Sequence, residues 1–329
     1  KQCFNRNKMK NKILIIAGDP NSINSEIISK TWRKIKPSLK NRLYLIANFD
    51  LIKKQLKIIK SKMSICKINQ IEENYSGNKL KIIDVPLNFK NPFNVSLEES
   101  RKYILKCFDL AHQLSQNKYI KGLINCPINK RLLNKSKIIG VTEFLASKCK
   151  IKNGSEVMLI HNKKLSVVPI TTHIDIKKVS KRINKDLIIK KIQTLQKDFL
   201  KLFNKKPRIG ILGLNPHNAE LLHNSEEIKI IIPAISKLQK LGFNVTGPLS
   251  ADTLFINNYK KYDVVVGMYH DQVLTPFKSL FHFDAINITL GLKYLRISPD
   301  HGPAKELINK NKANNLSLLK CVKFIDSLN

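Results

Sequence analysis

The sequence predicts an α/β fold with a largely parallel sheet. Short apolar runs alternate with longer segments that repeat apolar residues at helical spacing, which is typical of strands and helices in alternating layers. Most of the runs end at glycine, proline or a polar residue. The 329 residues are enough for two domains or one large unit.

Each element follows from its local pattern. Run 12–17 (KILIIA) is closed by Gly-Asp-Pro, and run 122–126 stops at Pro127. The apolar runs predicted to be strands are 12–17, 42–47, 122–126, 209–214 and 263–268. The segments predicted to be helical are 22–35, 97–116, 176–202 and 225–241. In such sheets ligands bind beyond the carboxyl ends of the strands, so polar residues that follow strands are candidates for a site.

The charge balance is extreme, with 59 Lys and Arg against 24 Asp and Glu and a formal net charge of +35. Only eight of the basic residues are Arg, and the Lys residues are spread along the whole chain. Nucleic-acid binders concentrate charge on one face and use Arg for recognition. We therefore expect no nucleic-acid partner, although duplex binding remains an alternative. The field favours anionic, phosphorylated small substrates.

Composition also bears on compartment. The six cysteines form no CxxC pair, which in a chain of this length indicates reduced thiols and a cytoplasmic location. No run of 18 apolar residues occurs, so we expect no membrane span. Residues 1–8 precede Met9 and the first apolar run, and we expect them to lie outside the fold.

Three histidines stand in similar settings, each directly after an apolar run. They are His173 (VVPITTH), His217 (ILGLNPH) and His270 (VVVGMYH). Converging at one sheet edge, three imidazoles could hold a divalent ion and leave positions open for substrate. Asp175 and Asp271 are close enough in sequence to orient them. Taken one at a time, each is better explained as a core or loop histidine bonded to a backbone carbonyl, and it is the occurrence of three that favours a site.

A second cluster lies near the C-terminus, where Asp300, His301 and Gly302 follow an apolar run. They could bind a ribose or adenine, or form an ordinary turn. Lys278 and Arg296 flank the cluster, and a guanidinium suits phosphate or carboxylate. The sequence contains no G-x-G-x-x-G after a strand, no Walker A lysine and no G-x-S-x-G elbow.

Several long motifs occur in order: GLNPH at 213–217, GPLSADTLF at 247–255, MYHDQ at 268–272, NITLGL at 287–292 and SPDHG at 298–302. Together they resemble the 4-hydroxythreonine-4-phosphate dehydrogenase family of the pyridoxal phosphate pathway, within the isocitrate/isopropylmalate dehydrogenase-like superfamily. The likeness covers nearly the whole chain.

The resemblance implies a homodimer of two-domain α/β/α subunits, with shared active sites in the interdomain cleft at the dimer interface. It implies a cofactor-side domain of residues 1–127 and 283–329, and a metal, substrate and dimerisation domain of residues 128–282. The site residues that it implies are His173, His217 and His270 for a divalent metal (Zn, Mg or Co); Thr142, Lys278, Asn287 and Arg296 for substrate; and Asp300, His301 and Gly302 for NAD or NADP.

The reaction implied is the oxidation and decarboxylation of 4-phosphooxy-L-threonine to 3-amino-2-oxopropyl phosphate. The metal would act as a Lewis acid on the hydroxyl while hydride leaves for the nicotinamide. Asp252 and Asp271 are both candidate proton acceptors, and the sequence does not decide between them.

Five segments depart from the family pattern: Pro303 stands for the usual Thr, Asn309-Lys310 for the usual Ala-Gly pair, and three others lie earlier in the chain. Val141 replaces the histidine of the usual Gly-His-Thr-Glu, the first loop at 18–26 has lost glycines, and 218–222 reads NAELL in place of Ala-Gly-Glu-Gly-Gly. Losing a charge-assisted hydrogen bond to phosphate costs about 1.5–3 kcal/mol. Two alternatives therefore stay open: a dehydrogenase of another phosphorylated hydroxy acid such as 4-phospho-threonate, or a degraded homologue that acts as a binding protein.

Overall fold

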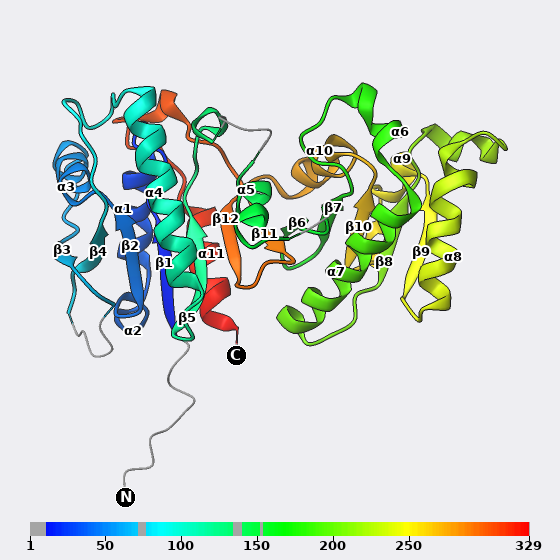
Figure 1. Ribbon diagram of the computed structural model, residues 1–329, viewed down its shortest axis with the longest axis horizontal. Helices are drawn as coiled ribbons and strands as arrows, with labels where there is room; N and C mark the ends of the chain where they lie inside the picture. Colours follow the sequence, from blue (N-terminus) through cyan, green and yellow to red (C-terminus); the bar gives the residue numbers. More distant parts are fainter. Residues whose placement is uncertain (1–10, 72–76, 134–139, 152–153, 329) are drawn as a thin grey trace, which may run out of the picture. The chain divides into compact units, whose positions relative to one another are not determined.

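A computed structural model describes residues 11–71, 77–133, 140–151 and 154–328; residues 1–8 lie outside this range. The chain forms two compact units (Figure 1). The terminal unit comprises residues 1–141 and 293–329, and the central unit is Thr142–Leu292. These boundaries lie later in the chain than those expected from the sequence, after residues 127 and 282.

The terminal unit is a parallel sheet in the order β3-β4-β2-β1-β5-β12. Its strands are β1 (Lys12–Ile16), β2 (Leu43–Ala47), β3 (Ile65–Ile68), β4 (Leu80–Asp84), β5 (Ile120–Asn125) and β12 (Arg296–Pro299). Ile15 pairs with Leu45 on one side and Ile124 on the other, and all of β1 and β2 is buried. Continuous apolar runs of this kind are typical of strands covered on both faces.

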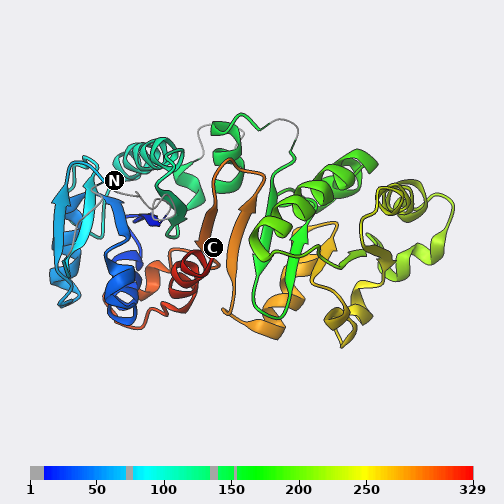
Figure 2. The same cartoon turned by 90° about the horizontal axis from the view of Figure 1, so that it is seen from below.

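Helices cover both faces of this sheet. Figure 2 shows α4 on one face and α1 and α11 on the other. The helices of the unit are α1 (Asn24–Lys34), α2 (Pro37–Lys40), α3 (Phe49–Ile58), α4 (Leu97–Ser115), α11 (Leu316–Ser327) and the short turns η2 (Lys130–Leu132) and η7 (Lys305–Leu307). Asn48 and Ser96 cap α3 and α4 by accepting from the backbone N–H three residues on.

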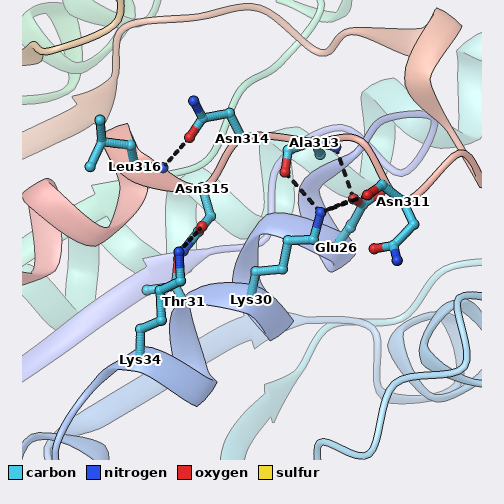
Figure 3. A network of polar contacts seen from close by, with 9 residues as sticks. All are labelled: Glu26, Lys30, Thr31, Lys34, Asn311, Ala313, Asn314, Asn315 and Leu316. Carbon is cyan, nitrogen blue, oxygen red and sulfur yellow. Dashed lines mark hydrogen bonds and ion pairs between the residues drawn. The ribbon is translucent and has the colours of Figure 1, made fainter.

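A polar network fastens the segment before α11 to α1 (Figure 3). Lys30 Nζ donates to Glu26 Oε1 at 2.7 Å and to the carbonyls of Asn311 and Ala313 at 3.0 and 2.9 Å. Glu26 Oε1 also accepts from the backbone N–H of Ala313 at 2.9 Å. The buried Glu26 carboxylate is therefore satisfied by donors from both segments.

The central unit has a mixed sheet in the order β11-β6-β7-β10-β8-β9. Its strands are β6 (Val157–His161), β7 (Ser166–Pro169), β8 (Ile209–Leu212), β9 (Val245–Leu249), β10 (Val264–Gly267) and β11 (Ile286–Leu290). Strand β6 is antiparallel to both β11 and β7, whereas β7, β10, β8 and β9 run parallel. The carboxyl ends of these four parallel strands share one edge.

The helices of this unit depart from two predictions. The predicted helix 176–202 is wrong as a single element, because Ile183 is extended and the Asn184 side chain caps a new helix by accepting from Leu187 N. The predicted helix 225–241 begins with a π turn. The elements are α5 (Val141–Lys148), η3 (Ile176–Lys178), α6 (Val179–Arg182), α7 (Lys185–Phe203), η4 (Pro216–Leu221), η5 (Glu227–Ile231), α8 (Ile232–Lys240), α9 (Ala251–Leu254), η6 (Asn258–Lys261) and α10 (His270–Phe281).

A buried apolar cluster of the central unit packs α10 against the sheet, with Val167, Leu212 and Val265 from neighbouring strands and Phe277 from α10. The site described below thus stands on a rigid core. Within the described ranges, no helix is long and apolar enough to cross a membrane.

Candidate functional site

The three predicted histidines emerge from one edge of the central sheet. His173 follows β7, His217 follows β8 within η4, and His270 follows β10 as the first residue of α10. Strand β10 lies between β7 and β8 and is parallel to both, with Val266 paired to Val168 and to Ile211. Parallel pairing alone therefore brings the three loops to the same side, as the strand-end argument requires.

Two of the imidazoles lie side by side. The ring centroids of His173 and His270 are 5.4 Å apart, with the ring planes at 42°. Asp271 Oδ1 lies 2.6 Å from His270 Nδ1. A carboxylate on one ring nitrogen orients a metal-binding histidine and leaves Nε2 for the ion. Asp175 Oδ1 accepts from Lys177 N at 3.0 Å, and so caps the turn that follows His173.

His217 differs from the other two histidines in its exposure and in its backbone conformation. Its side chain is exposed, and its Nδ1 lies 4.0 Å from Asp252 Oδ2. The run 217–221 has φ values of 49°, 57°, 51°, 47° and 55°, all in the left-handed region, although it contains no glycine. This conformation costs about 1–2 kcal/mol for each non-glycine residue.

The three histidines therefore suit a divalent ion in two respects: imidazole nitrogens are suitable ligands, and all three follow strands that end at one sheet edge. In the parts of the chain that the structure describes, however, no three His, Cys, Asp or Glu side chains are grouped as a metal site. His173 and His270 are brought together, and His217 would have to turn toward them.

The proposed substrate side of the central unit adjoins His173. Thr142, in the first turn of α5, is 7 % exposed, and its Oγ1 lies 3.2 Å from Thr289 Oγ1 on β11. Asn287 lies on the same face of β11 as Thr289, because side chains two apart on a strand share a face. Glu143, next to Thr142, accepts from Thr172 Oγ1 at 3.0 Å and so ties α5 to the loop of His173.

Two acceptor atoms in this region are buried without a hydrogen-bond partner among the described residues: Asn287 Oδ1 and Glu143 Oε2. A buried polar atom without a partner is costly, and in native proteins it calls for an explanation such as a ligand or a water molecule. The face of β11 that bears Asn287 is therefore suited to a polar ligand.

The cationic candidates fall in both units. Lys278 is half-buried on α10, eight residues after His270, which corresponds to about 12 Å along the helix axis. Arg296 is on β12 of the terminal unit, is 2 % exposed, and donates from Nε to Asn125 Oδ1 at 2.7 Å. That bond fixes the plane of the Arg296 guanidinium against β5.

The loops after β1, β5 and β12 meet at the carboxyl edge of the terminal sheet. Ile23 N donates to Pro303 O at 3.2 Å, and Asn129 N donates to Asp19 Oδ2 at 3.2 Å. Burial raises the pKa of Asp19 despite the hydrogen bonds from Asn21 and Asn129 that lower it.

The segment 300–302 belongs to this edge. Asp300 N donates to Ser317 Oγ at 3.0 Å, and His301 Nδ1 lies 2.9 Å from Gly302 O. A Cβ atom placed on Gly302 would meet no atom within 4 Å. Packing within the chain therefore does not require glycine here, and the backbone is open to a ligand.

Some residues of the site were not singled out by sequence reasoning. Thr289 and Glu143 stand inside quoted motifs without an assigned role. Gln272 and the buried Glu227 make contacts between loops that no local pattern announces. The one signal in the sequence is that Gln272 follows the candidate ligand His270 by two residues.

Comparisons with known proteins agree on one family. A family model for the pyridoxal phosphate biosynthetic protein PdxA matches residues 39–325. A 4-hydroxythreonine-4-phosphate dehydrogenase from Aquifex aeolicus is 36 % identical over 327 residues, covering 97 % of this chain and 99 % of that protein. A protein from Oceanobacillus iheyensis, provisionally named a D-threonate 4-phosphate dehydrogenase, is 32 % identical over 320 residues, covering 94 % and 95 %.

Solved structures give the same picture. The crystal structure of a 4-hydroxythreonine-4-phosphate dehydrogenase from Klebsiella pneumoniae has a TM-score of 0.83 and 29 % identity, covering 96 % of this chain and 98 % of that one. An isocitrate dehydrogenase from Methylococcus capsulatus has a TM-score of 0.50 at 10 % identity, covering 96 % and 84 %, and shares the fold alone.

Proposed function

The chain belongs to the PdxA family of 4-hydroxythreonine-4-phosphate dehydrogenases, and from this we propose that it oxidises 4-phosphooxy-L-threonine in pyridoxal phosphate biosynthesis. The membership confirms the resemblance and the dehydrogenase-like α/β fold class predicted from the motifs, and it makes the chain an oxidoreductase. The nicotinamide cofactor, held by Asp300, His301 and Gly302, would supply the hydride acceptor for the hydroxyl carbon, while Asp252 or Asp271 would take the hydroxyl proton. The β-keto acid would then lose carbon dioxide and take up a proton to give 3-amino-2-oxopropyl phosphate.

His173, His217 and His270 are the residues that would hold the divalent ion, whether Zn, Mg or Co. The support is their common sheet edge and the 5.4 Å approach of the His173 and His270 rings. When bound, the ion supplies Lewis-acid stabilisation of the developing alkoxide. Asp271 would orient His270 through Nδ1.

Thr142, Asn287 and Lys278 would position the phosphate and carboxylate of the substrate, together with Arg296. Thr142 and Asn287 are supported by the shared β11 face and by the buried acceptor of Asn287. An amide whose acceptor is buried can rotate to donate to a phosphate oxygen. The net charge of +35 favours such anionic substrates.

The terminal unit would bind the nicotinamide cofactor, NAD or NADP, through Asp300, His301 and Gly302. The open space around Gly302 and the position of this segment after β12 support the assignment. Asp300 would accept from a ribose hydroxyl.

Asp252 and Asp271 are the proposed proton acceptors. The structure pairs them with different histidines, Asp271 with His270 at 2.6 Å and Asp252 with His217 at 4.0 Å. Steady-state kinetics of Asp252→Asn and Asp271→Asn separates the two, because loss of the proton acceptor should lower kcat far more than loss of a carboxylate that only orients a histidine.

The working form would be a homodimer with shared active sites. Large apolar side chains are exposed on the central unit, more than half of each side chain in the case of Ile176, Leu222, Ile256 and Phe283. Apolar side chains that gather on one face would suit a surface between two subunits, and these four are the candidates for it. The molar mass in solution tests this, and a monomer at micromolar concentration would contradict it.

Oxidation of D-threonate 4-phosphate is the second candidate. Val141 keeps it open, because valine supplies no hydrogen bond where the family has histidine, and one of the relatives carries that provisional name. The two acids differ at the carbon that bears the amine or hydroxyl, next to the oxidised centre.

The test is NADH formation from each acid by the purified chain, with Zn²⁺, Mg²⁺ or Co²⁺ and again after chelation. His270→Ala is the inactive control, and exposed His223→Ala is the matched control that should keep activity. Metal-dependent NADH from 4-phosphooxy-L-threonine supports the main proposal. NADH from the threonate alone supports the second candidate. NADH from neither acid would overturn both candidates, and a chain that then binds metal but not NAD would be the degraded homologue.

A further inference from the structure

One buried carboxylate holds the loop that carries His217. Glu227, at the start of the π turn η5, has no exposed surface. Its Oε1 accepts from Leu214 N at 2.7 Å and Asn215 N at 2.8 Å, and its Oε2 accepts from Asn215 Nδ2 at 3.0 Å. Every one of these partners is a donor, which favours an ionised carboxylate, because a protonated one would add a hydrogen that none of them accepts.

The ionised state is favoured by these contacts. Burial raises the pKa of Glu227, but the hydrogen bonds from Asn215 and Leu214 outweigh it and the pKa is lowered overall. Charge-assisted bonds of this kind are the stronger ones in proteins.

A second side chain links the His217 loop to the His270 loop. Gln272 Oε1 accepts from Met268 N at 2.7 Å, and Gln272 Nε2 donates to Gly213 O at 2.7 Å. Met268 precedes His270 by two residues, and Gly213 opens the loop to His217. One amide therefore spans the ends of β10 and β8.

Close approach at Gly213 makes this arrangement possible. A Cβ atom there would lie 2.1 Å from Asn218 Oδ1 and 3.0 Å from Glu227 Oε1. Asn218 in turn donates from Nδ2 to Pro248 O at 3.3 Å, in the segment before Asp252. The loops after β8 and β10 are therefore tied to each other and to the end of β9.

We infer that Glu227 and Gln272 are positioning residues, which hold the backbones bearing His217 and His270 at the spacing that metal binding requires. The inference rests on the proposed function, since it takes both histidines as ligands. Neither side chain touches the reaction itself. Residues that orient metal ligands typically change metal affinity by about 10–100-fold when replaced.

The experiment measures Zn²⁺ and Co²⁺ dissociation constants by calorimetric titration of the full chain, alongside the melting temperature of the metal-free chain. The variants are Glu227→Gln, which replaces one acceptor oxygen by a donor, and Gln272→Glu, which keeps the acceptor for Met268 N but loses the donor to Gly213 O. Glu227→Asp is the conservative variant that retains the charge.

Glu26→Gln is the matched control. Glu26 is also a buried carboxylate that accepts from a backbone N–H, that of Ala313, but it lies in the terminal unit (Figure 3). We expect its melting temperature to fall as in Glu227→Gln while its metal affinity stays that of the wild type.

A tenfold or greater weakening in Glu227→Gln and Gln272→Glu, with partial recovery in Glu227→Asp, would support the inference. Affinities within twofold of Glu26→Gln would overturn it and leave the proposed metal site standing. If Glu227→Gln does not fold, Gln272→Glu decides alone. A wild-type chain that binds neither ion would overturn the metal site and the positioning role together.

Discussion

Restoring a histidine at position 141 measures what the departure from the family pattern costs. Val141 is the first residue of α5, is half-buried, and precedes Thr142 and its bond to Thr289. In Val141→His we expect a lower KM for 4-phosphooxy-L-threonine, because an imidazole N–H can donate to phosphate and an isopropyl group cannot.

The magnitude follows from the charge that the imidazole carries. A charged hydrogen bond is worth about 1.5–3 kcal/mol and a neutral one about 0.5–1.5 kcal/mol. The positive end of the α5 dipole disfavours an imidazolium at its first residue, so the neutral range applies at pH 8. Since about 1.4 kcal/mol is tenfold, the expected fall in KM is roughly two- to tenfold.

Steady-state kinetics with both phosphorylated acids is the assay, and Val141→Leu is the control that changes size without adding a donor. Lowering the pH toward 6 should widen the gain, because protonation strengthens the bond to phosphate. A KM for both acids within the error of wild type would refute the reasoning. A gain with the threonate alone would instead identify the threonate as the substrate that this position contacts.

Three further predictions concern stability. Burial lowers the pKa of His161 to about 4, from 6.5. The stability that depends on its neutral form is therefore full above pH 6.5 and is lost as the pH falls toward 4. In His161→Gln this loss of unfolding free energy, up to about 3 kcal/mol, should disappear, as measured by urea unfolding at pH 7 and pH 4.5. Burial raises the pKa of Asp263, but Arg208 and Lys205 outweigh it and lower the pKa to about 2. Because those cations are half exposed, Asp263→Asn should cost only about 1 kcal/mol at pH 7, and that difference in unfolding free energy should shrink as the pH falls from about 4 to 2. Ala219, at a φ of 51°, should stabilise the chain by about 1 kcal/mol when replaced by Gly, and an unchanged melting temperature would contradict the strain argued for η4.

Local pattern was enough for the strands that carry the site. Runs 12–17, 209–214 and 263–268 became β1, β8 and β10 within two residues at each end, because continuous burial on both faces requires continuous apolar sequence. The break in helix 176–202 was less visible. Ile183 continues the apolar spacing of a helix, but the Asn184 side chain accepts from Leu187 N and caps a new helix, so the backbone is extended at Ile183.

The site was predictable to the extent that it depends on strand order. Three strand-end histidines reach one edge because β7, β10 and β8 are parallel neighbours, which the sequence suggested but could not establish. The orientation of His217 depends on five successive left-handed residues, and these lack the glycines that would have signalled them. The role of Glu227 could not be predicted from the sequence, because its donors, Leu214 N and Asn215 N, belong to a different loop.

The lysine-rich composition extends from the surface into the interior of the molecule. Lys191 is only 6 % exposed, and burial lowers its pKa. Its Nζ donates to the carbonyl of Glu156 at 2.6 Å, so the buried amine has a hydrogen-bond partner. The buried acceptors of Asn287 and Glu143 would be costly to leave with neither a ligand nor a water molecule beside them. They therefore mark a polar site, and NADH formation from the two phosphorylated acids decides whether that site still turns over a substrate.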